Sequence, residues 1–221
     1  MASPSTFDIT FDQVARRFGR RWALGGVSFQ VKTGEGVMLT GHNGSGKSTL
    51  LRCLSTALKL HQGQIRIGGQ ELWSNRHTLR PHIGFLSHAG YLYDDLSGAD
   101  NLRVWARLGG IQVDPYPLLE RVGLPPKRLD PVRTYSAGMR RRLAVARLML
   151  QKPRIVLLDE PYTALDAEGR DLVTQVAGSL RAEGATLLMA THLVEYAQYV
   201  CDRHVQLLDG RLDGDSRLGT P

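Results

Sequence analysis

Alternating apolar and polar residues mark the beginning of this chain. They occur in FDITF and again in GVSFQVK, and QIRIGG follows further along. A period of two is typical of strands with one buried face, so these segments predict antiparallel strands. The glycines between the first two segments favour turns. They are Gly19, Gly25 and Gly26.

Unbroken apolar runs replace this alternation further along. Each run is short and bounded by polar residues, which is typical of parallel strands buried on both faces. The four runs are GVMLTG, HIGFLS, RIVLLDE and ATLLMATH. We expect them to form a mostly parallel central sheet. Near the end, HVQLLDGRLDGD carries an Asp-Gly turn between short strands and predicts a terminal hairpin.

A helical stretch separates the second and third apolar runs. It has a capping pattern from Ser97 to Asp100, the helix ADNLRVWARL, the Pro-rich link GLPPKRLDP and a helix that starts at Ser136. The pattern predicts one α/β domain over residues 1–221. Its core would comprise residues 1–88 and 151–221, including the antiparallel β subdomain, and residues 89–150 would form an inserted helical subdomain.

Composition is that of a globular protein, with 221 residues and 42% hydrophobic content. No apolar run approaches the roughly 18 residues of a membrane helix, and MASPSTFDIT lacks a signal pattern, so we expect a cytoplasmic protein. Cys53 and Cys201 lie far apart without metal-ligand spacing, which favours buried thiols over a disulfide or zinc site.

The net charge is +7, with 28 basic and 21 acidic residues. Such a balance suits an anionic partner, such as a nucleotide, a nucleic acid or the cytoplasmic membrane face. A generally basic surface explains it equally well, so charge alone identifies no partner.

The stretch GHNGSGKST fits G-x-x-x-x-G-K-[ST], directly after the strand VMLT and directly before LLRCLSTAL. Its glycines let the backbone wrap a phosphate chain, and amides at the helix start point at it. Lys47 would reach the β- and γ-phosphates, and the Ser48 hydroxyl would bind Mg²⁺. The predicted binding residues are Gly41, His42, Asn43, Gly44, Ser45, Gly46, Lys47, Ser48 and Thr49.

Polar residues follow three of the central strands, and strand carboxyl ends are where such sheets bind ligands. RIVLLD ends in Asp159 and Glu160; Asp159 suits a Mg²⁺-bound water and Glu160 the base that orients the attacking water. TLLMA ends at Thr191 and His192, and we expect His192 to form hydrogen bonds beside the γ-phosphate. His88 follows IGFL at the same edge, where it could face Mg²⁺, water or the helical insert.

The stretch TYSAGMRRR suggests a second anion site. Ser136 resembles a helix N-cap, but Met139 stands where a capping box needs Glu or Gln. The helix start is therefore open to an external anion, and Gly138 lets that anion approach the backbone. The insert separates this helix from its own phosphate loop, so a second copy of the chain in a two-fold dimer would supply the phosphate. A solvated basic helix face explains the following arginines equally well. They are Arg140, Arg141 and Arg142.

Taken together, these motifs resemble those of nucleotide-binding subunits of ABC transporters, which are P-loop NTPases. Phe18 in RRFGRRWAL matches the aromatic residue that stacks on adenine; GHNGSGKST matches Walker A, YSAGM the signature, and RIVLLDE Walker B. TALD, which ends at Asp166, matches the D-loop, and His192 matches the switch histidine. The resemblance covers nearly the whole chain.

This resemblance implies an ATPase that uses ATP and Mg²⁺, with Lys47, Glu160 and His192 in catalysis. Mg²⁺ would involve Ser48, Asp159 and His88. Two chains would close around two ATP molecules, with contacts in trans from Ser136, Gly138 and Asp166. The partner would be an integral membrane subunit, with no direct nucleic-acid contact expected, and the ATPase would lie peripherally on the cytoplasmic face of the inner membrane.

Two positions depart from the family pattern. The signature is usually LSGGQ, so Tyr135, Ala137 and Met139 differ, while Ser136 and Gly138 remain. His88 replaces the usual glutamine, which leaves its Mg²⁺ contact and coupling role open.

Within the family, LSHAGYLYDDLSG and YSAGMRRRLAVAR are most similar to the ATPase of the cytochrome c maturation haem-export system. Drug or polysaccharide exporter ATPases are the alternative, many with an additional C-terminal domain. ABC ATPases that act on DNA or ribosomes, or in iron–sulfur cluster assembly, share the motifs. Against the former, we see neither a long coiled-coil insert nor a second cassette. The motifs specify neither the cargo nor the direction of transport.

Overall fold

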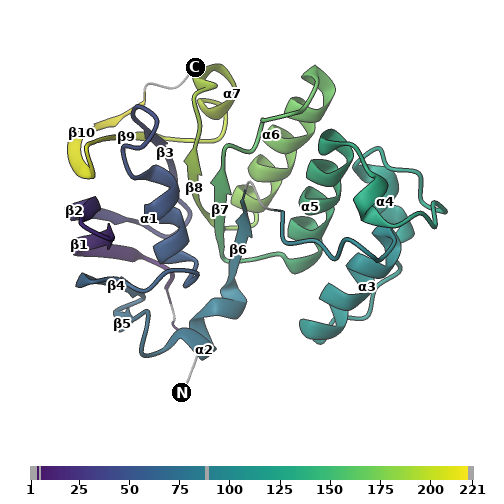
Figure 1. The fold of residues 1–221 in the computed structure, drawn as a ribbon, viewed down its shortest axis with the longest axis horizontal. Helices are drawn as coiled ribbons and strands as arrows, with labels where there is room; N and C mark the ends of the chain where they lie inside the picture. The colour runs from purple at the N-terminus through teal and green to yellow at the C-terminus, as the bar shows by residue number, and fades with distance from the viewer. Residues whose placement is uncertain (1–3, 5, 88–89, 219–221) are drawn as a thin grey trace.

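Two β-sheets and the helices around them make up the computed structural model, which describes residues 4, 6–87 and 90–218 (Figure 1). The first sheet is antiparallel, with strand order β2-β1-β4-β5. Its strands are β1 Ile9–Phe18, β2 Arg21–Val31, β4 Gln62–Ile67 and β5 Gln70–Glu71. The predicted antiparallel β subdomain is confirmed.

One detail of its first hairpin was predicted wrongly. Gly25 and Gly26 lie inside β2 rather than in a turn, and only Gly19 lies in the turn between β1 and β2. Val14 pairs with Val27 and Ala15 with Gly25, so Gly26 is an extra residue in β2, with φ of 92°. Glycine adopts this left-handed geometry without strain, which makes it suitable for a β-bulge that the alternation pattern does not show.

The second sheet is the central one, with strand order β10-β9-β3-β8-β7-β6. All its neighbouring strands are parallel except β10, which pairs antiparallel with β9. Its strands are β3 Gly36–Thr40, β6 Ile83–Leu86, β7 Ile155–Asp159, β8 Thr186–Ala190, β9 Arg203–Leu208 and β10 Arg211–Arg217. The four apolar runs are therefore the predicted parallel strands, and the terminal hairpin is confirmed.

Helices cover both faces of the central sheet, with α1 on one side and α5 and α6 on the other (Figure 1). Met38 of β3 packs in the core with α5, whereas Val37 and Leu39 pack in the core with α1. Burial on both faces explains why these strands lack alternating polar residues. The helices are α1 Lys47–Leu54, α2 Arg76–Leu79, α3 Gly98–Leu108, α4 Tyr116–Arg121, α5 Ala137–Gln151, α6 Ala167–Ala182 and α7 Val194–Ala197, with short 3₁₀ turns at Arg80–His82 and Val132–Thr134.

Both predicted helix starts are confirmed. The Ser97 side chain accepts a hydrogen bond from the Asp100 amide, and the Ser136 side chain accepts one from the Met139 amide. Each satisfies an amide that has no partner inside its helix. The predicted burial of Cys53 and Cys201 is also confirmed, and both are unpaired.

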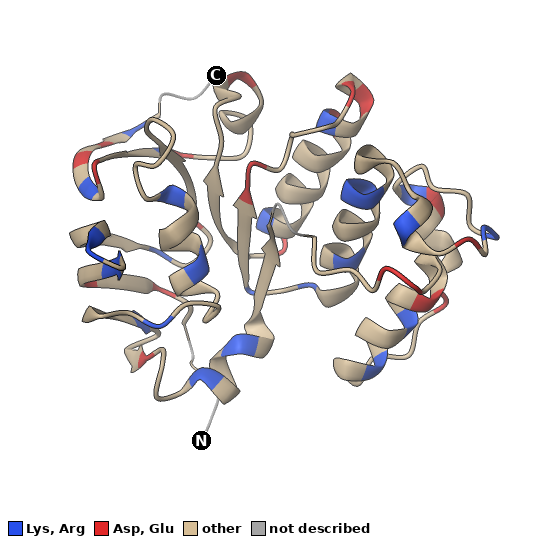
Figure 2. Cartoon of the chain, in the orientation of Figure 1, with Lys and Arg blue, Asp and Glu red and all other residues tan. Residues whose placement is uncertain are grey.

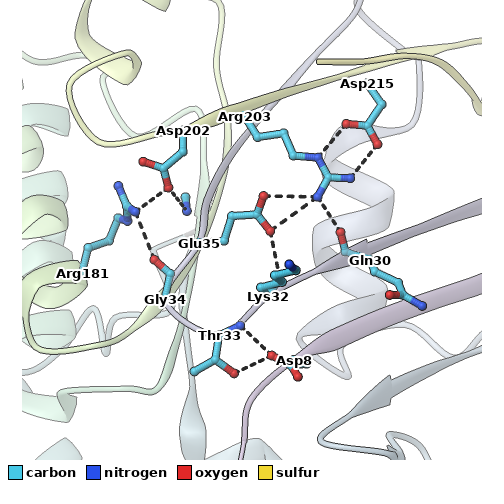
Figure 3. A network of polar contacts seen from close by, with 11 residues as sticks. Asp8, Gln30, Lys32, Thr33, Gly34, Glu35, Arg181, Asp202, Arg203 and Asp215 are labelled. Carbon is cyan, nitrogen blue, oxygen red and sulfur yellow. Dashed lines mark hydrogen bonds and ion pairs between the residues drawn. The ribbon is translucent and has the colours of Figure 1, made fainter. Parts of the chain in front are cut away.

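A polar network holds the C-terminal hairpin to the turn that precedes β3 (Figure 3). Arg203 donates two hydrogen bonds of 2.6 Å to the Asp215 carboxylate and one of 2.7 Å to the Gln30 carbonyl. It also lies 3.2 Å from Glu35 Oε1. The guanidinium lowers the pKa of Asp215, so the ion pair favours the ionised carboxylate. This network fixes β9 and β10 beside β3.

Candidate functional site

The loop between β3 and α1 is built from glycines in conformations that other residues rarely adopt. Gly41, Gly44 and Gly46 have φ values of 137°, 86° and 109°. A Cβ atom on Gly41 would lie 2.1 Å from the Leu207 carbonyl oxygen, and one on Gly46 would lie 2.6 Å from that of Ala23. Both the backbone angles and the close approach therefore require glycine.

Lys47, the first residue of α1, folds back over this loop. Its Nζ donates to the carbonyl oxygens of Gly41 at 2.7 Å and His42 at 3.2 Å, and the residue is only 6% exposed. Burial lowers the pKa of Lys47, while the charges of Glu160 and Asp159 act in the opposite direction. No acidic residue occupies the first turn of α1, so the amides at its start and Lys47 form a cradle suited to phosphate.

The C-terminal hairpin supports this phosphate cradle from outside. The Gly210 amide donates to the Ser45 carbonyl at 3.0 Å, and the Gly210 carbonyl accepts from the Gly25 amide at 2.8 Å. Asp209 Oδ1 lies 3.2 Å from Nε2 of His42 in the loop. No local sequence pattern predicts this support, because the contacting residues lie far apart in the chain.

Ser48 and Asp159 form a pair of oxygen ligands beside the cradle. The Ser48 hydroxyl donates to Asp159 Oδ1 at 2.8 Å, and Asp159 is 7% exposed. Hydroxyl and carboxylate oxygens suit Mg²⁺, which keeps several waters and binds through few protein ligands together with substrate phosphates. The described residues contain no cluster of three or more His, Cys, Asp or Glu side chains that could hold a metal alone. His88 lies outside the described residues.

Glu160 and His192 meet at the ends of β7 and β8. Nε2 of His192 lies 3.3 Å from Glu160 Oε1 and 3.2 Å from Oδ1 of Asn43 in the phosphate loop. The Glu160 amide donates to the Ala190 carbonyl at 2.8 Å, which joins the two strand ends. Glu160 has a φ of 47°, a left-handed conformation that is strained for a residue with a side chain. The structure thus brings a carboxylate, a histidine and the phosphate loop together.

A cleft of about 430 Å³ opens beside this cluster. Its lining residues are Phe18, Arg21, Ala23, Asn43, Gly44, Gly46, Lys47, Ser48, Thr49 and Glu160. Phe18 is 48% exposed and presents a free aromatic surface, while the Arg16 guanidinium lies 5.1 Å from its ring centroid. An exposed aromatic ring at one end and a phosphate cradle at the other match the two ends of a nucleotide.

Arg21 in this cleft was missed by the sequence analysis. A Cβ atom on Gly44 of the phosphate loop would lie 3.6 Å from its Nη2 atom. Arginine positions, coloured blue, gather at this end of the β1–β2 hairpin (Figure 2). Across residues 4, 6–87 and 90–218, no side-chain hydrogen bond or ion pair engages the Arg21 guanidinium, so its charge is available to an anion. The stretch RRFGRRW indicates a basic segment, but the sequence does not show which of its four arginines faces the cleft.

The three residues expected to act in trans do not line this cleft within one chain. Ser136 caps α5, and a Cβ atom on Gly138 would lie 3.1 Å from the Ala164 carbonyl oxygen. Asp166 caps α6 by accepting from the Gly169 amide at 2.9 Å, and it pairs with Arg142 at 3.0 Å. Each therefore has a structural role in its own chain, and the trans role stays a prediction.

The arginines after the signature do not form a solvated basic face. Arg140 pairs with Asp94, and Arg142 pairs with Asp166. Arg141 is only 7% exposed and bonds to backbone carbonyls. The alternative that these residues are simply solvated is therefore wrong for Arg141.

Comparison with known proteins agrees with this geometry. The family model described as "ABC transporter" matches residues 24–163. The chain is 34% identical to Nod factor export ATP-binding protein I of Ralstonia nicotianae, over 94% of this chain and 66% of that protein. It is 36% identical to daunorubicin resistance ATP-binding protein DrrA3 of Streptomyces coeruleorubidus, over 88% of this chain and 63% of that one. The chain thus spans about two thirds of the length of these relatives.

Solved structures show the same fold. An ATP-binding subunit of an ABC transporter superimposes with a TM-score of 0.86 and 27% identity, over 95% of this chain and 90% of that one. A dimeric ATP-binding cassette in a post-hydrolysis state with ADP and Pi gives a TM-score of 0.85 and 25% identity, over 96% and 99%. The family match, the relatives and the fold together show that this chain belongs to the ABC transporter family, as an ATP-binding ABC ATPase.

Proposed function

We propose that the chain is the ATP-binding and ATP-hydrolysing subunit that drives a separate membrane subunit of a transporter. The observation that carries this proposal is the meeting of Lys47, Ser48, Asp159, Glu160 and His192 around one glycine loop at the mouth of the cleft. These residues come from α1, from β7 and from the segments that follow β7 and β8.

Different residues along the cleft bind different parts of the nucleotide. Phe18 stacks on the adenine, and Lys47 contacts the β- and γ-phosphates. Arg21, which lies near Gly44 of the loop, contacts the phosphate chain as well. The remaining contacts come from the backbone and side chains of the loop, at Gly41, His42, Asn43, Gly44, Ser45, Gly46, Ser48 and Thr49.

Hydrolysis uses Glu160 as the base that orients and deprotonates the attacking water. Nε2 of His192 lies 3.3 Å from Glu160 Oε1 and hydrogen-bonds Asn43 Oδ1, and together with Asn43 it holds the end of the γ-phosphate in line. Ser48 and Asp159 would hold Mg²⁺, which would neutralise charge that develops on the phosphates. His88, which lies outside the described residues, is proposed as a further Mg²⁺ ligand or coupling residue.

The second anion site at Ser136, Gly138 and Asp166 would receive the ATP of a partner chain. A dimer is supported by the structural relative captured as a dimeric cassette with ADP and Pi. Since the start of α5 does not line its own cleft, a two-fold dimer gives it a phosphate to bind.

The membrane subunit would dock in a second, larger cavity of about 920 Å³. This groove lies between the end of α1, α2, β6, α3 and α5, where α3 to α5 belong to the proposed helical subdomain of residues 89–150. Its lining combines aromatic side chains with cations, including Trp73, Tyr91, Tyr93, Trp105, Arg76 and Arg80. Such a lining suits a short amphipathic segment with acidic residues.

Among the described residues no helix has the length and apolar character needed to cross a membrane. We propose a peripheral position on the cytoplasmic face of the inner membrane.

Export is the direction that the relatives favour. Two of them are named for Nod factor export and for daunorubicin resistance. Haem export for cytochrome c biogenesis rests only on the sequence resemblance, and the relatives' names do not support it.

The test of this proposal is Lys47→Ala. Removing the ammonium that the loop carbonyls and phosphates share should abolish nearly all Mg²⁺-dependent ATP hydrolysis, with an unchanged circular dichroism spectrum. Lys127, which is exposed and lies outside the cleft lining, is the matched control: Lys127→Ala should hydrolyse ATP at the parent rate. Parent-like hydrolysis by Lys47→Ala would place the nucleotide site elsewhere.

A further inference from the structure

Arg141 is a buried cation in the first turns of α5. It is 7% exposed, its Nη1 donates to the Ser87 carbonyl at 3.0 Å, and its Nη2 donates to the Glu160 carbonyl at 3.3 Å. None of the ion pairs found in the described residues includes it, whereas Arg140 and Arg142 on either side each pair with an aspartate. Burial lowers the pKa of Arg141, which reflects the free-energy cost of keeping this charge out of water.

The carbonyl that Arg141 holds belongs to the residue proposed as the catalytic base. The Glu160 carbonyl also accepts from the Thr163 amide at 3.3 Å, and the Glu160 amide donates to the Ala190 carbonyl at 2.8 Å. Between these bonds Glu160 is kept at a φ of 47°, where a non-glycine residue stays only if its surroundings hold it. The direction of its side chain toward His192 depends on that backbone conformation.

We propose that Arg141 is a positioning residue for Glu160: by clamping the Glu160 carbonyl to the Ser87 carbonyl, it holds the carboxylate where it can activate water. This inference rests on the proposed function. Hydrolysis is sensitive to such placement, since a shift of about 1 Å in a catalytic group lowers rates by roughly 100-fold. ATP binding depends on the phosphate loop and Phe18, which Arg141 does not contact, so affinity should be unaffected.

The rest of α5 has its own attachment to this region. Arg147, two turns further along, donates to the carbonyls of Phe85, Gly90 and Tyr91 at 2.8–3.1 Å, and its guanidinium lies 4.8 Å from the Trp105 ring centroid. Since these bonds are independent of Arg141, helix α5 should stay attached to β6 when Arg141 is replaced. Variants at Arg141 should therefore remain folded.

The experiment measures the rate constant of Mg²⁺-ATP hydrolysis at saturating ATP, where both sites of the dimer are filled, together with the ATP dissociation constant. Arg141→Met keeps the volume and removes the donors; its rate constant should fall at least about 10-fold while the dissociation constant changes less than about twofold. Arg141→Lys keeps a charge but has no planar fork to span both carbonyls, so its rate should fall by about threefold. Arg140→Met removes the partly exposed pair with Asp94 and a hydrogen bond to the Val132 carbonyl, neither of which involves Glu160, so this variant should match the parent.

A double-mutant cycle separates positioning of Glu160 from a general structural effect. In the Glu160→Gln background, Arg141→Met should cause no further loss of the slow residual hydrolysis, measured over hours. An equal loss in both backgrounds, or weaker ATP binding at an unchanged rate, would overturn the proposal. A parent-like rate in Arg141→Lys would also overturn the proposal, and this variant keeps the test decisive if Arg141→Met does not fold. A parent protein without hydrolysis would instead overturn the proposed function.

Discussion

Replacing Ser136 by Asp tests whether the start of α5 receives a phosphate from a second chain. In the single chain Ser136 is an exposed N-cap that accepts from the Met139 amide, and the first turn of α5 has no acidic residue. Asp caps helices as well as Ser does, and its charge favours a helix N-terminus by about 0.3–1 kcal/mol. Ser136→Asp should therefore leave the free energy of unfolding unchanged or raise it slightly.

The effect on the dimer should have the opposite sign. A carboxylate about 4 Å from a phosphate charge is repelled by roughly 4 kcal/mol at an effective dielectric constant near 20. That energy corresponds to a loss of about 1,000-fold in affinity at each nucleotide. A residue that only caps α5 would cause no such loss, because the added charge would face water.

The assay uses the Glu160→Gln background, in which ATP should bind without being hydrolysed, and measures the monomer–dimer equilibrium by sedimentation with and without ATP. Ser136→Asn is the matched control, because Asn has the shape of Asp and caps a helix but carries no charge. We expect ATP-dependent dimers with Ser136→Asn and monomers with Ser136→Asp, both binding ATP. If the two variants dimerise equally, Ser136 is a simple helix cap and the site in trans is wrong.

Two further predictions concern the cleft and the core. Arg21→Ala should weaken equilibrium binding of ATP by about 10-fold, since a charge-assisted hydrogen bond contributes roughly 1.5–3 kcal/mol. Arg20→Ala is the control and should bind ATP like the parent. Equal affinities for both variants would exclude a phosphate contact by Arg21. Burial raises the pKa of both Cys53 and Cys201 to about 12, so at pH 8 only roughly 1 in 10,000 thiols is ionised. A disulfide reagent should thus label neither cysteine in the native protein and both in denaturant, and rapid native labelling would contradict their burial.

Features that depend on residues close in sequence were predictable. The glycines and Lys47 of the phosphate loop, the four unbroken strands and the caps at Ser97 and Ser136 are confirmed as structural elements. Steric limits on φ and ψ, hydrophobic periodicity and local hydrogen bonds act within a few residues, so a sequence pattern carries them directly. Glu160 and His192 were also placed correctly at one sheet edge, because parallel strands end there together.

What only the tertiary structure decided depends on contacts between distant segments. Gly210 supports the phosphate loop at Ser45, Arg21 reaches that loop from β2, and Arg141 joins Ser87 to Glu160. In the sequence, Arg141 is one of three consecutive arginines, and nothing local distinguishes it from its neighbours. Arg141 is buried because its side chain points toward the central sheet once α5 has packed there. The packing of α5 is set by the whole core rather than by adjacent residues.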